Sequence, residues 1–207
     1  MRRAGGDRVT RGIALVTTLA WAAPALLGRS KIADVQLGFI PLRAFVDGPF
    51  VIPFLLTPLT ATLAHGGAVH LIFNMLLLVF CGRQVEAVLG GRSFAVLYAA
   101  GAYGAALAHF AVGPQSPVPM IGASGAISAV FALYGLLFGR DEVRRIGPVP
   151  AHWIRVAWLA VAWIGLQALM SFATRGTDMA IATAAHVGGF LIGLLLARPL
   201  LGLRYRG

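Results

Sequence analysis

Charged side chains are scarce in this chain, and their scarcity excludes a water-soluble globule. Only 12% of the 207 residues are Asp, Glu, Lys or Arg, whereas a soluble domain averages about 25%. Hydrophobic residues make up 58%, and the mean hydropathy is +0.82. A disordered chain is excluded as well, because disordered chains contain few apolar residues. The composition therefore indicates an integral membrane protein that folds as one unit.

Cysteine and acidic residues are also rare. Cys81 is the single cysteine, which excludes a disulfide framework. Seven acidic residues against 17 basic ones give a net charge of +10. The basic residues are dispersed rather than gathered in a run with interleaved aromatics, so they indicate orientation in a membrane and not nucleic-acid binding. The expected partners are membrane lipids and membrane proteins.

The spacing of the charges predicts six transmembrane helices. Charge-free intervals run from 17 to 47 residues, and one crossing needs about 20 apolar residues. The longest interval is divided by the proline-rich segment 113–119, which cannot be helical. We predict an all-α membrane protein, a six-helix bundle with spans near residues 12–28, 68–88, 93–112, 123–139, 155–173 and 180–198. Residues 48–64 are apolar but contain Pro53 and Pro58, so we expect interfacial or re-entrant structure there.

The distribution of basic residues predicts the orientation of the bundle. If the N-terminus is cytoplasmic, four of the 17 Lys and Arg residues lie on the outer side and the other 13 lie on the inner side. Both termini are then cytoplasmic, with residues 1–11 and 202–207 as short basic tails on a membrane domain of residues 12–201. Residues 1–28 also resemble a secretory signal. Five later spans favour an uncleaved first helix, and cleavage would leave the orientation of the others unchanged.

Polar side chains inside the predicted spans are few, and each is a candidate functional residue because its burial in lipid is costly. No Asp lies in a span, and the one Glu, Glu86, lies near a span end. Their absence excludes a carboxylate proton relay and an aspartyl protease dyad. No HExxH motif is found, and we expect neither a metal nor another cofactor. The remaining candidates include His70, Asn74, Ser124, Ser128 and His186.

Three of these candidates lie at a similar depth. A helical rise of about 1.5 Å per residue places His70, Ser124 and His186 in one layer below the outer surface. Small residues follow Ser124 and His186 at helical spacing, which lets two helices approach closely. The two stripes are Ser124, Ser128 and Ala132, and His186, Gly189, Gly193 and Ala197. This arrangement predicts that the hydroxyl of Ser124 lies within hydrogen-bond reach of the His186 imidazole.

A serine beside an imidazole is the chemistry of an activated nucleophile. Gly122 and Gly125 clear space around the serine, and a helix start supplies free N–H groups for an oxyanion. His70 and Asn74 share one helix face and can add donors. Taken singly, each residue is explained equally well by helix packing or an interhelical hydrogen bond; their common depth favours catalysis. His65 is predicted to be a hydrogen-bonding hub of the loop before the second span.

The motifs resemble the rhomboid family of intramembrane serine proteases. The similar stretches are residues 65–75, 83–90, 122–126 and 185–193, and the resemblance covers about Leu56 to Leu201. It implies that Ser124 is the nucleophile and His186 the general base, without a third carboxylate. It also implies oxyanion or substrate contacts from His70, Asn74, Gly122 and the Ser124 backbone. The implied activity is cleavage of transmembrane substrate helices near their outer ends, and the first loop, about residues 30–66, is implied to lie partly in the membrane.

The chain departs from the family pattern at two places. Many members carry Trp-Arg in the first loop, where this chain has Leu56 and Thr57, and many have an aromatic residue at the position of Ser128. We therefore expect His186 either to be positioned less firmly or to be held by another ring, such as Phe190 or Phe131.

Two other functions and the location of the protein follow from the same residues. The alternative to a protease is a weak or inactive rhomboid-like protein that binds membrane helices, although intact Ser124 and His186 argue against it. A transporter would show inverted repeats or intramembrane charge, and neither is visible. The bias toward arginine and alanine, with no eukaryotic targeting signal, predicts a bacterial inner membrane.

Overall fold

The computed structural model describes the chain except for residues 1–5, 140–144, 146, 174–182 and 206–207, and except for the side chains of residues 152, 164 and 166–173. Six long helices form the body of the fold: α1 (Arg8–Leu26), α4 (Ala68–Leu89), α5 (Gly91–Val112), α6 (Ser124–Phe138), α7 (Ala151–Ala173) and α8 (Thr183–Tyr205). The first loop contains the short helices α2 (Ser30–Leu37), η1 (Pro41–Ala44), η2 (Phe54–Leu56), α3 (Thr57–Thr60) and η3 (Ala61–Leu63).

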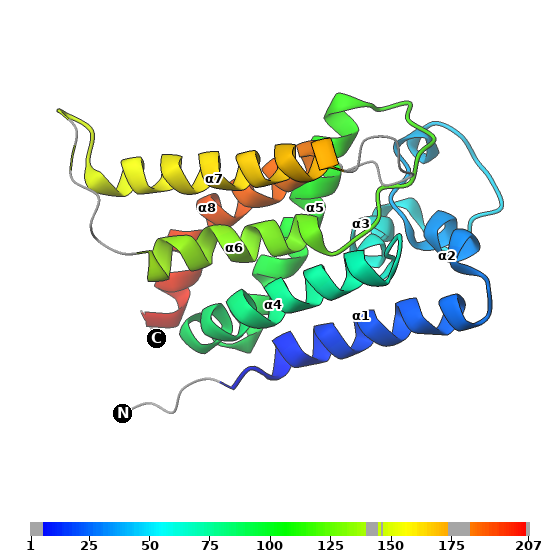
Figure 1. The fold of residues 1–207 in the computed structure, drawn as a ribbon, viewed down its shortest axis with the longest axis horizontal. Coiled ribbons are helices and arrows are strands. Elements are labelled where there is room, and N and C mark those ends of the chain that lie inside the picture. Colours follow the sequence, from blue (N-terminus) through cyan, green and yellow to red (C-terminus); the bar gives the residue numbers. More distant parts are fainter. Residues whose placement is uncertain (1–5, 140–144, 146, 174–182, 206–207) are drawn as a thin grey trace.

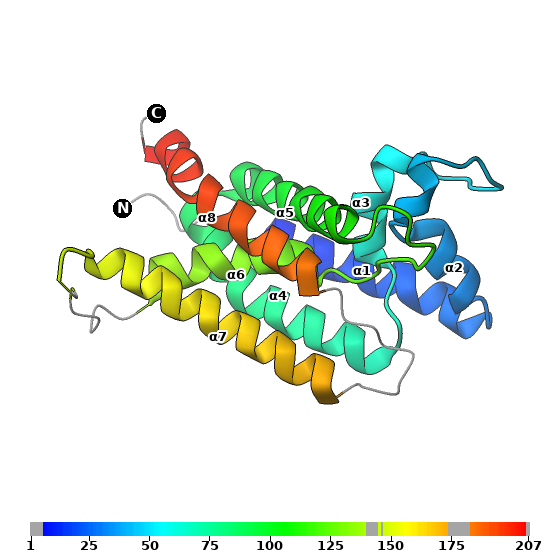
Figure 2. The same ribbon diagram turned by 90° about the horizontal axis from the view of Figure 1, so that it is seen from above.

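The long helices lie side by side with α6 in the middle (Figure 1). Helices α4, α6 and α8 run in one direction, and α1, α5 and α7 return in the other (Figures 1 and 2). Helix α6 contacts α4, α5, α7 and α8, and most of its side chains are buried. The start of α1 and the end of α8 lie at one end of the bundle, and the first loop lies at the opposite end (Figures 1 and 2).

Each predicted span coincides with a helix, although not every helix is long enough to span a membrane. Four helices within the described residues, α1, α4, α5 and α8, are long and apolar enough to cross one. Helix α6 has 15 residues and is shorter than a normal span. Its neighbours enclose it, so α6 can be short without exposing its ends to lipid. Helix α7 has 23 residues, and its part with described side chains includes the apolar stretch Trp153–Trp163.

The helix ends differ from the predicted bounds where a charged residue was taken to mark the end of a span. Helix α1 begins at Arg8 rather than at residue 12, and α8 continues to Tyr205 rather than ending at 198. Charged side chains extend from a helix into the aqueous interface, so a charge marks the edge of the hydrocarbon and not the end of the helix. The predicted start of the last span, residues 180–182, lies outside the described residues.

The first loop is built from short helical turns, as its prolines require. Pro58 lies in the first turn of α3, where a missing backbone N–H does no harm. Thr57 and Ala61 are buried against the bundle. Phe39 and Met120 exchange two backbone hydrogen bonds of 3.0 and 2.8 Å, so this loop holds the segment that leads into α6.

The closest helix contacts use glycine, as predicted. A side chain at Gly189 would collide with the carbonyl oxygen of Gly125, and one at Gly193 would collide with the carbonyl oxygen of Ala129. Helices α5 and α8 meet in the same way at Gly104 and Gly188. The α6 side of the contact is therefore Gly125 and Ala129, with Ser128 beside them. The predicted stripe takes part as well, because Ser124 contacts His186, Ser128 lies against Gly189, and Ala132 belongs to a buried cluster with Phe190.

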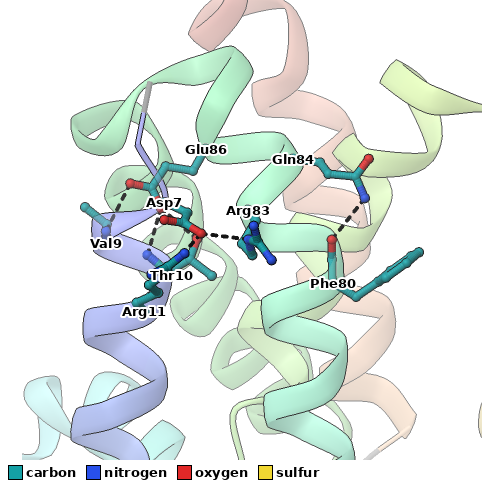
Figure 3. A network of polar contacts seen from close by, with 8 residues as sticks. All are labelled: Asp7, Val9, Thr10, Arg11, Phe80, Arg83, Gln84 and Glu86. Atoms are coloured by element: carbon teal, nitrogen blue, oxygen red, sulfur yellow. Dashed lines mark hydrogen bonds and ion pairs between the residues drawn. The ribbon is translucent and has the colours of Figure 1, made fainter. Parts of the chain in front are cut away.

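Glu86 ties α4 to the start of α1 (Figure 3). Its carboxylate, which is 1% exposed, accepts the backbone N–H groups of Val9 at 3.0 Å and Thr10 at 2.7 Å, and the Thr10 hydroxyl at 2.7 Å. An anion at a helix N-terminus satisfies free N–H groups and complements the helix dipole. Asp7 forms ion pairs with Arg11 and Arg83 beside it. Glu86 therefore has a structural role.

We expect Glu86→Ala to lower the free energy of unfolding by about 3 kcal/mol, because three donors in a buried site lose their acceptor. Chemical unfolding in detergent micelles measures the change. The matched control is Gln84→Ala on the same helix, since Gln84 only donates to the Phe80 carbonyl within α4; its effect should stay within about 0.5 kcal/mol. Equal losses in both variants would show that the carboxylate does not hold α1 to α4.

Candidate active site

Ser124 and His186 lie in contact at the start of two parallel helices. Ser124 is the first residue of α6, and His186 lies in the first turn of α8. The Ser124 Oγ is 2.6 Å from the His186 Nε2, across 62 residues of sequence. The imidazole is 6% exposed, and Ser124 is half-buried. The predicted contact between these two side chains is therefore present.

His65 holds the backbone that leads to the serine. The Ala123 N–H donates to the His65 Nε2 at 3.4 Å, and the Trp21 indole N–H donates to the His65 carbonyl at 2.8 Å. Burial, together with the nearby His70, lowers the pKa of His65 to about 3. The ring is therefore neutral at physiological pH and can accept the Ala123 N–H. His65 is a hydrogen-bonding hub, as its place before the second span predicted.

Gly122 and His70 close the space beside the serine. The φ angle of Gly122 is +112°, a conformation that residues with a side chain rarely adopt. A Cβ atom there would lie 2.8 and 2.9 Å from the Cε1 and Nε2 atoms of His70, and 3.7 Å from the Ser124 Oγ. The His70 ring thus lies across Gly122 and next to the nucleophile candidate. Only glycine satisfies both the backbone angle and this contact.

Two predicted donors have partners of their own. The Gly122 N–H donates to the Ala61 carbonyl at 2.9 Å, which joins the serine segment to η3. The Asn74 side chain is buried and donates through Nδ2 to the His70 carbonyl one turn earlier, at 2.9 Å. Among the described residues, the backbone N–H of Ser124 has no acceptor. The His70 ring and this N–H are therefore two candidate donors beside the Ser124 hydroxyl.

The ring beside His186 comes from α7, which was not predicted. Trp163 and His186 have ring centroids 6.5 Å apart at an interplanar angle of 69°. Of the two rings expected to hold the histidine, Phe131 stacks on Trp163 at 4.5 Å, and Phe190 lies in the same buried cluster as Trp163. Ser128 is buried and donates to the Ser124 carbonyl at 2.7 Å. No periodicity within a single helix identifies Trp163, because the contact depends on how α7 packs against α6 and α8.

The arrangement can activate a hydroxyl. When the Ser124 O–H donates to Nε2, the imidazole is neutral and carries its own proton on Nδ1. An imidazole in this position can take the hydroxyl proton as the oxygen attacks an electrophile. The free N–H at the start of α6 can donate to a developing negative charge.

The fold and this site define an integral membrane protein with a Ser–His pair enclosed by helices, and comparison with known proteins agrees. The Rhomboid domain matches residues 55–203, which is most of the chain. The chain belongs to the Rhomboid family. The matched residues include α4, α6 and α8, the three helices that carry the site.

Several relatives have been curated. The chain is 28% identical over 177 residues to RHOMBOID-like protein 4 of Arabidopsis thaliana, covering 85% of this chain and 41% of the relative. It is 29% identical to the putative rhomboid protease YdcA of Bacillus subtilis, and this match covers 66% of this chain and 65% of the relative. It is 33% identical to the rhomboid protease GluP of the same bacterium, and this match covers 72% of this chain and 26% of the relative. The chain thus spans between about a quarter and two thirds of the length of these relatives.

We expect acid to destabilise the protein through His65. The unfolded chain, with an ordinary histidine pKa of about 6.5, binds a proton between pH 6.5 and about 3 that the folded chain excludes. Stability should therefore fall as the pH is lowered through this window, by at most about 1.4 kcal/mol per pH unit from this residue. Unfolding in micelles at several pH values, in the unaltered protein and His65→Gln, measures the slope. Identical slopes would contradict a buried, neutral His65.

Proposed function

We propose that the chain is an intramembrane serine endopeptidase that cleaves transmembrane substrate helices near their outer ends. The observation that carries this proposal is the 2.6 Å contact between the Ser124 Oγ and the His186 Nε2. Two polar side chains from separate helices meet in a largely apolar bundle, where a purely structural role would be served more cheaply by apolar residues. Membership of the Rhomboid family, and two relatives named as rhomboid proteases, support the same class of reaction.

The proposed reaction is acyl transfer through Ser124. The Ser124 oxygen attacks the carbonyl carbon of the scissile peptide bond while its proton passes to the His186 Nε2. The C–N bond then breaks, and the imidazolium gives this proton to the departing amine. The remaining ester is hydrolysed by a water molecule that His186 deprotonates, which regenerates the serine hydroxyl. No third carboxylate takes part, so the catalytic unit is a dyad.

The oxyanion of the tetrahedral intermediate is assigned to the neighbourhood of Ser124 on α6 and His70 on α4. Its candidate donors are the Ser124 backbone N–H and the His70 ring, which the glycine at 122 admits beside the Ser124 Oγ. Asn74 donates one of its two amide hydrogens to the His70 carbonyl, and the second amide hydrogen is a further candidate donor to the oxyanion. Loss of one such donor typically costs 10²- to 10³-fold in kcat.

The short length of α6 supports a site sunk below the outer membrane surface. A helix of 15 residues is about 22 Å long, whereas the hydrocarbon layer is about 30 Å thick. If the end of α6 lies at the inner edge, Ser124 lies about 8 Å below the outer edge. A serine at this depth would cut a substrate helix near its outer end. Because Ser124 is half-buried, water can reach it from the outer side.

The proposed topology has six spans, formed by α1 and α4 to α8, with both termini in the cytoplasm. Basic residues gather at the end of the bundle that contains the start of α1 and the end of α8: Arg8, Arg11, Arg83, Arg92, Arg198 and Arg204. Few lie at the opposite end, which the first loop occupies. Cytoplasmic loops carry such an excess of basic residues.

Cleavage of a transmembrane substrate by the reconstituted protein tests the proposed reaction. We expect Ser124→Ala and His186→Ala each to lower kcat by at least about 10³-fold, because each removes one half of the dyad. Ser128→Ala is the matched control, a buried serine one turn along α6. We expect kcat of Ser128→Ala to fall by less than about tenfold, because this variant loses a single hydrogen bond, from the Ser128 hydroxyl to the Ser124 carbonyl.

Cleavage that persists in Ser124→Ala would refute the proposed mechanism. Binding of the substrate helix without cleavage by the unaltered protein would favour the alternative, a rhomboid-like binding protein.

Single cysteines test the topology. In a Cys81→Ala background we expect a membrane-impermeant maleimide to label Val51→Cys on intact cells, since Val51 is 84% exposed in the first loop. Tyr205→Cys, at a residue 72% exposed near the end of α8, should be labelled only after the membrane is opened. The reverse pattern would contradict the cytoplasmic termini.

A further inference from the structure

A stack of two aromatic rings lies behind the imidazole of His186. Trp163 of α7 meets the imidazole at a centroid distance of 6.5 Å and an angle of 69°, an edge-to-face arrangement within the range of attractive aromatic pairs. Phe131 of α6 stacks on the other part of the indole at 4.5 Å and 27°. Trp163 is 5% exposed, and it belongs to one buried cluster with Ala132 and Phe190. The indole is therefore fixed by its neighbours.

The packing of α6 against α8 explains why this ring comes from α7. Ser128 is fully buried, and a side chain at Gly189 would already lie 3.3 Å from the Ser128 Cβ. Backbones this close leave no room for a ring between them at position 128. Helix α7 lies alongside both helices (Figure 2), so a side chain from α7 can reach the imidazole.

Polar contacts orient only one side of the His186 ring. The Nε2 atom bonds to Ser124. Within the part of the chain that the structure describes, the Nδ1 atom has no hydrogen-bond partner. A ring held by its Cβ atom and by one hydrogen bond at Nε2 can still turn about the axis between them, so contacts with its faces and edges restrict its plane.

We propose that Trp163 positions the imidazole of His186 for proton transfer with Ser124, an inference that rests on the proposed protease function. In this proposal Trp163 takes no part in the bond changes and acts only through the histidine. It takes the place of the aromatic side chain that Ser128 cannot supply. The position of α7 is thereby linked to the geometry of the dyad, and a shift of α7 would weaken the reaction without touching the serine.

The rate at which a fluorophosphonate labels Ser124 tests this inference without a substrate helix. In that reaction the serine oxygen displaces fluoride from phosphorus, and His186 again takes the proton. We expect Trp163→Leu, which keeps an apolar side chain but no ring, to slow labelling about tenfold. Trp163→Phe should restore most of the rate, because it returns an aromatic face. Trp158→Leu is the control, since Trp158 lies on the same helix and is 65% exposed.

Cleavage kinetics and stability separate positioning from a structural role. For Trp163→Leu we expect kcat to fall while KM stays nearly constant, because substrate binding does not depend on the imidazole plane. Thermal unfolding in micelles shows whether the variant is folded at the assay temperature. Phe131→Ala, which removes the support under the indole, should slow labelling in the same direction and less strongly.

The two possible failures are distinguishable. If a folded Trp163→Leu labels at the rate of the unaltered protein, or if Trp163→Phe is as slow as Trp163→Leu, the positioning role is wrong while the protease function stands. If the unaltered protein is not labelled at Ser124, both the protease function and the role of Trp163 are overturned.

Discussion

The near contact of the α6 and α8 backbones is the constraint on which the site depends. Gly189 and Gly193 of α8 lie against the backbone carbonyl groups of Gly125 and Ala129 of α6, and a side chain at either α8 glycine would force the two helices apart. At this separation a short serine side chain on α6 reaches an imidazole on α8. A separation wider by the thickness of one methyl group would break the 2.6 Å contact. The chemistry therefore depends on residues that have no polar atoms in their side chains.

A second set of contacts fixes the height and direction of the serine. The segment before α6 is attached to the first loop by Phe39, Ala61 and His65, through backbone and imidazole hydrogen bonds. These bonds hold the last turn before the helix, and this turn places Gly122 and Ser124 beside the ring of His70. The first loop, with its short turns and prolines, is thus part of the site's scaffold.

Much of the fold could be predicted because a membrane restricts where charged and polar residues occur in a sequence. Charged residues avoid the membrane interior, so the charge-free intervals located the helices. Polar residues inside these helices are costly, and this cost singled out His70, Ser124 and His186 as candidate functional residues. The depth of each residue follows from the helical rise, so their meeting could be anticipated. The amide of Asn74 could not be placed, because a bond to its own helix competes with any bond to a ligand. Trp163 was missed because side-by-side packing of α7 with α6 leaves no signal within either helix.

The central claim is that the Ser124 hydroxyl is activated by His186 inside the helix bundle. An experimental structure of the protein after reaction with a phosphonate inhibitor tests this claim most directly. The account predicts a bond from phosphorus to the Ser124 oxygen, a phosphoryl oxygen directed at the Ser124 N–H and the His70 ring, and the His186 Nε2 within hydrogen-bond distance of the adduct. A structure in which the inhibitor is attached elsewhere, or in which the imidazole is turned away from the modified serine, would contradict it.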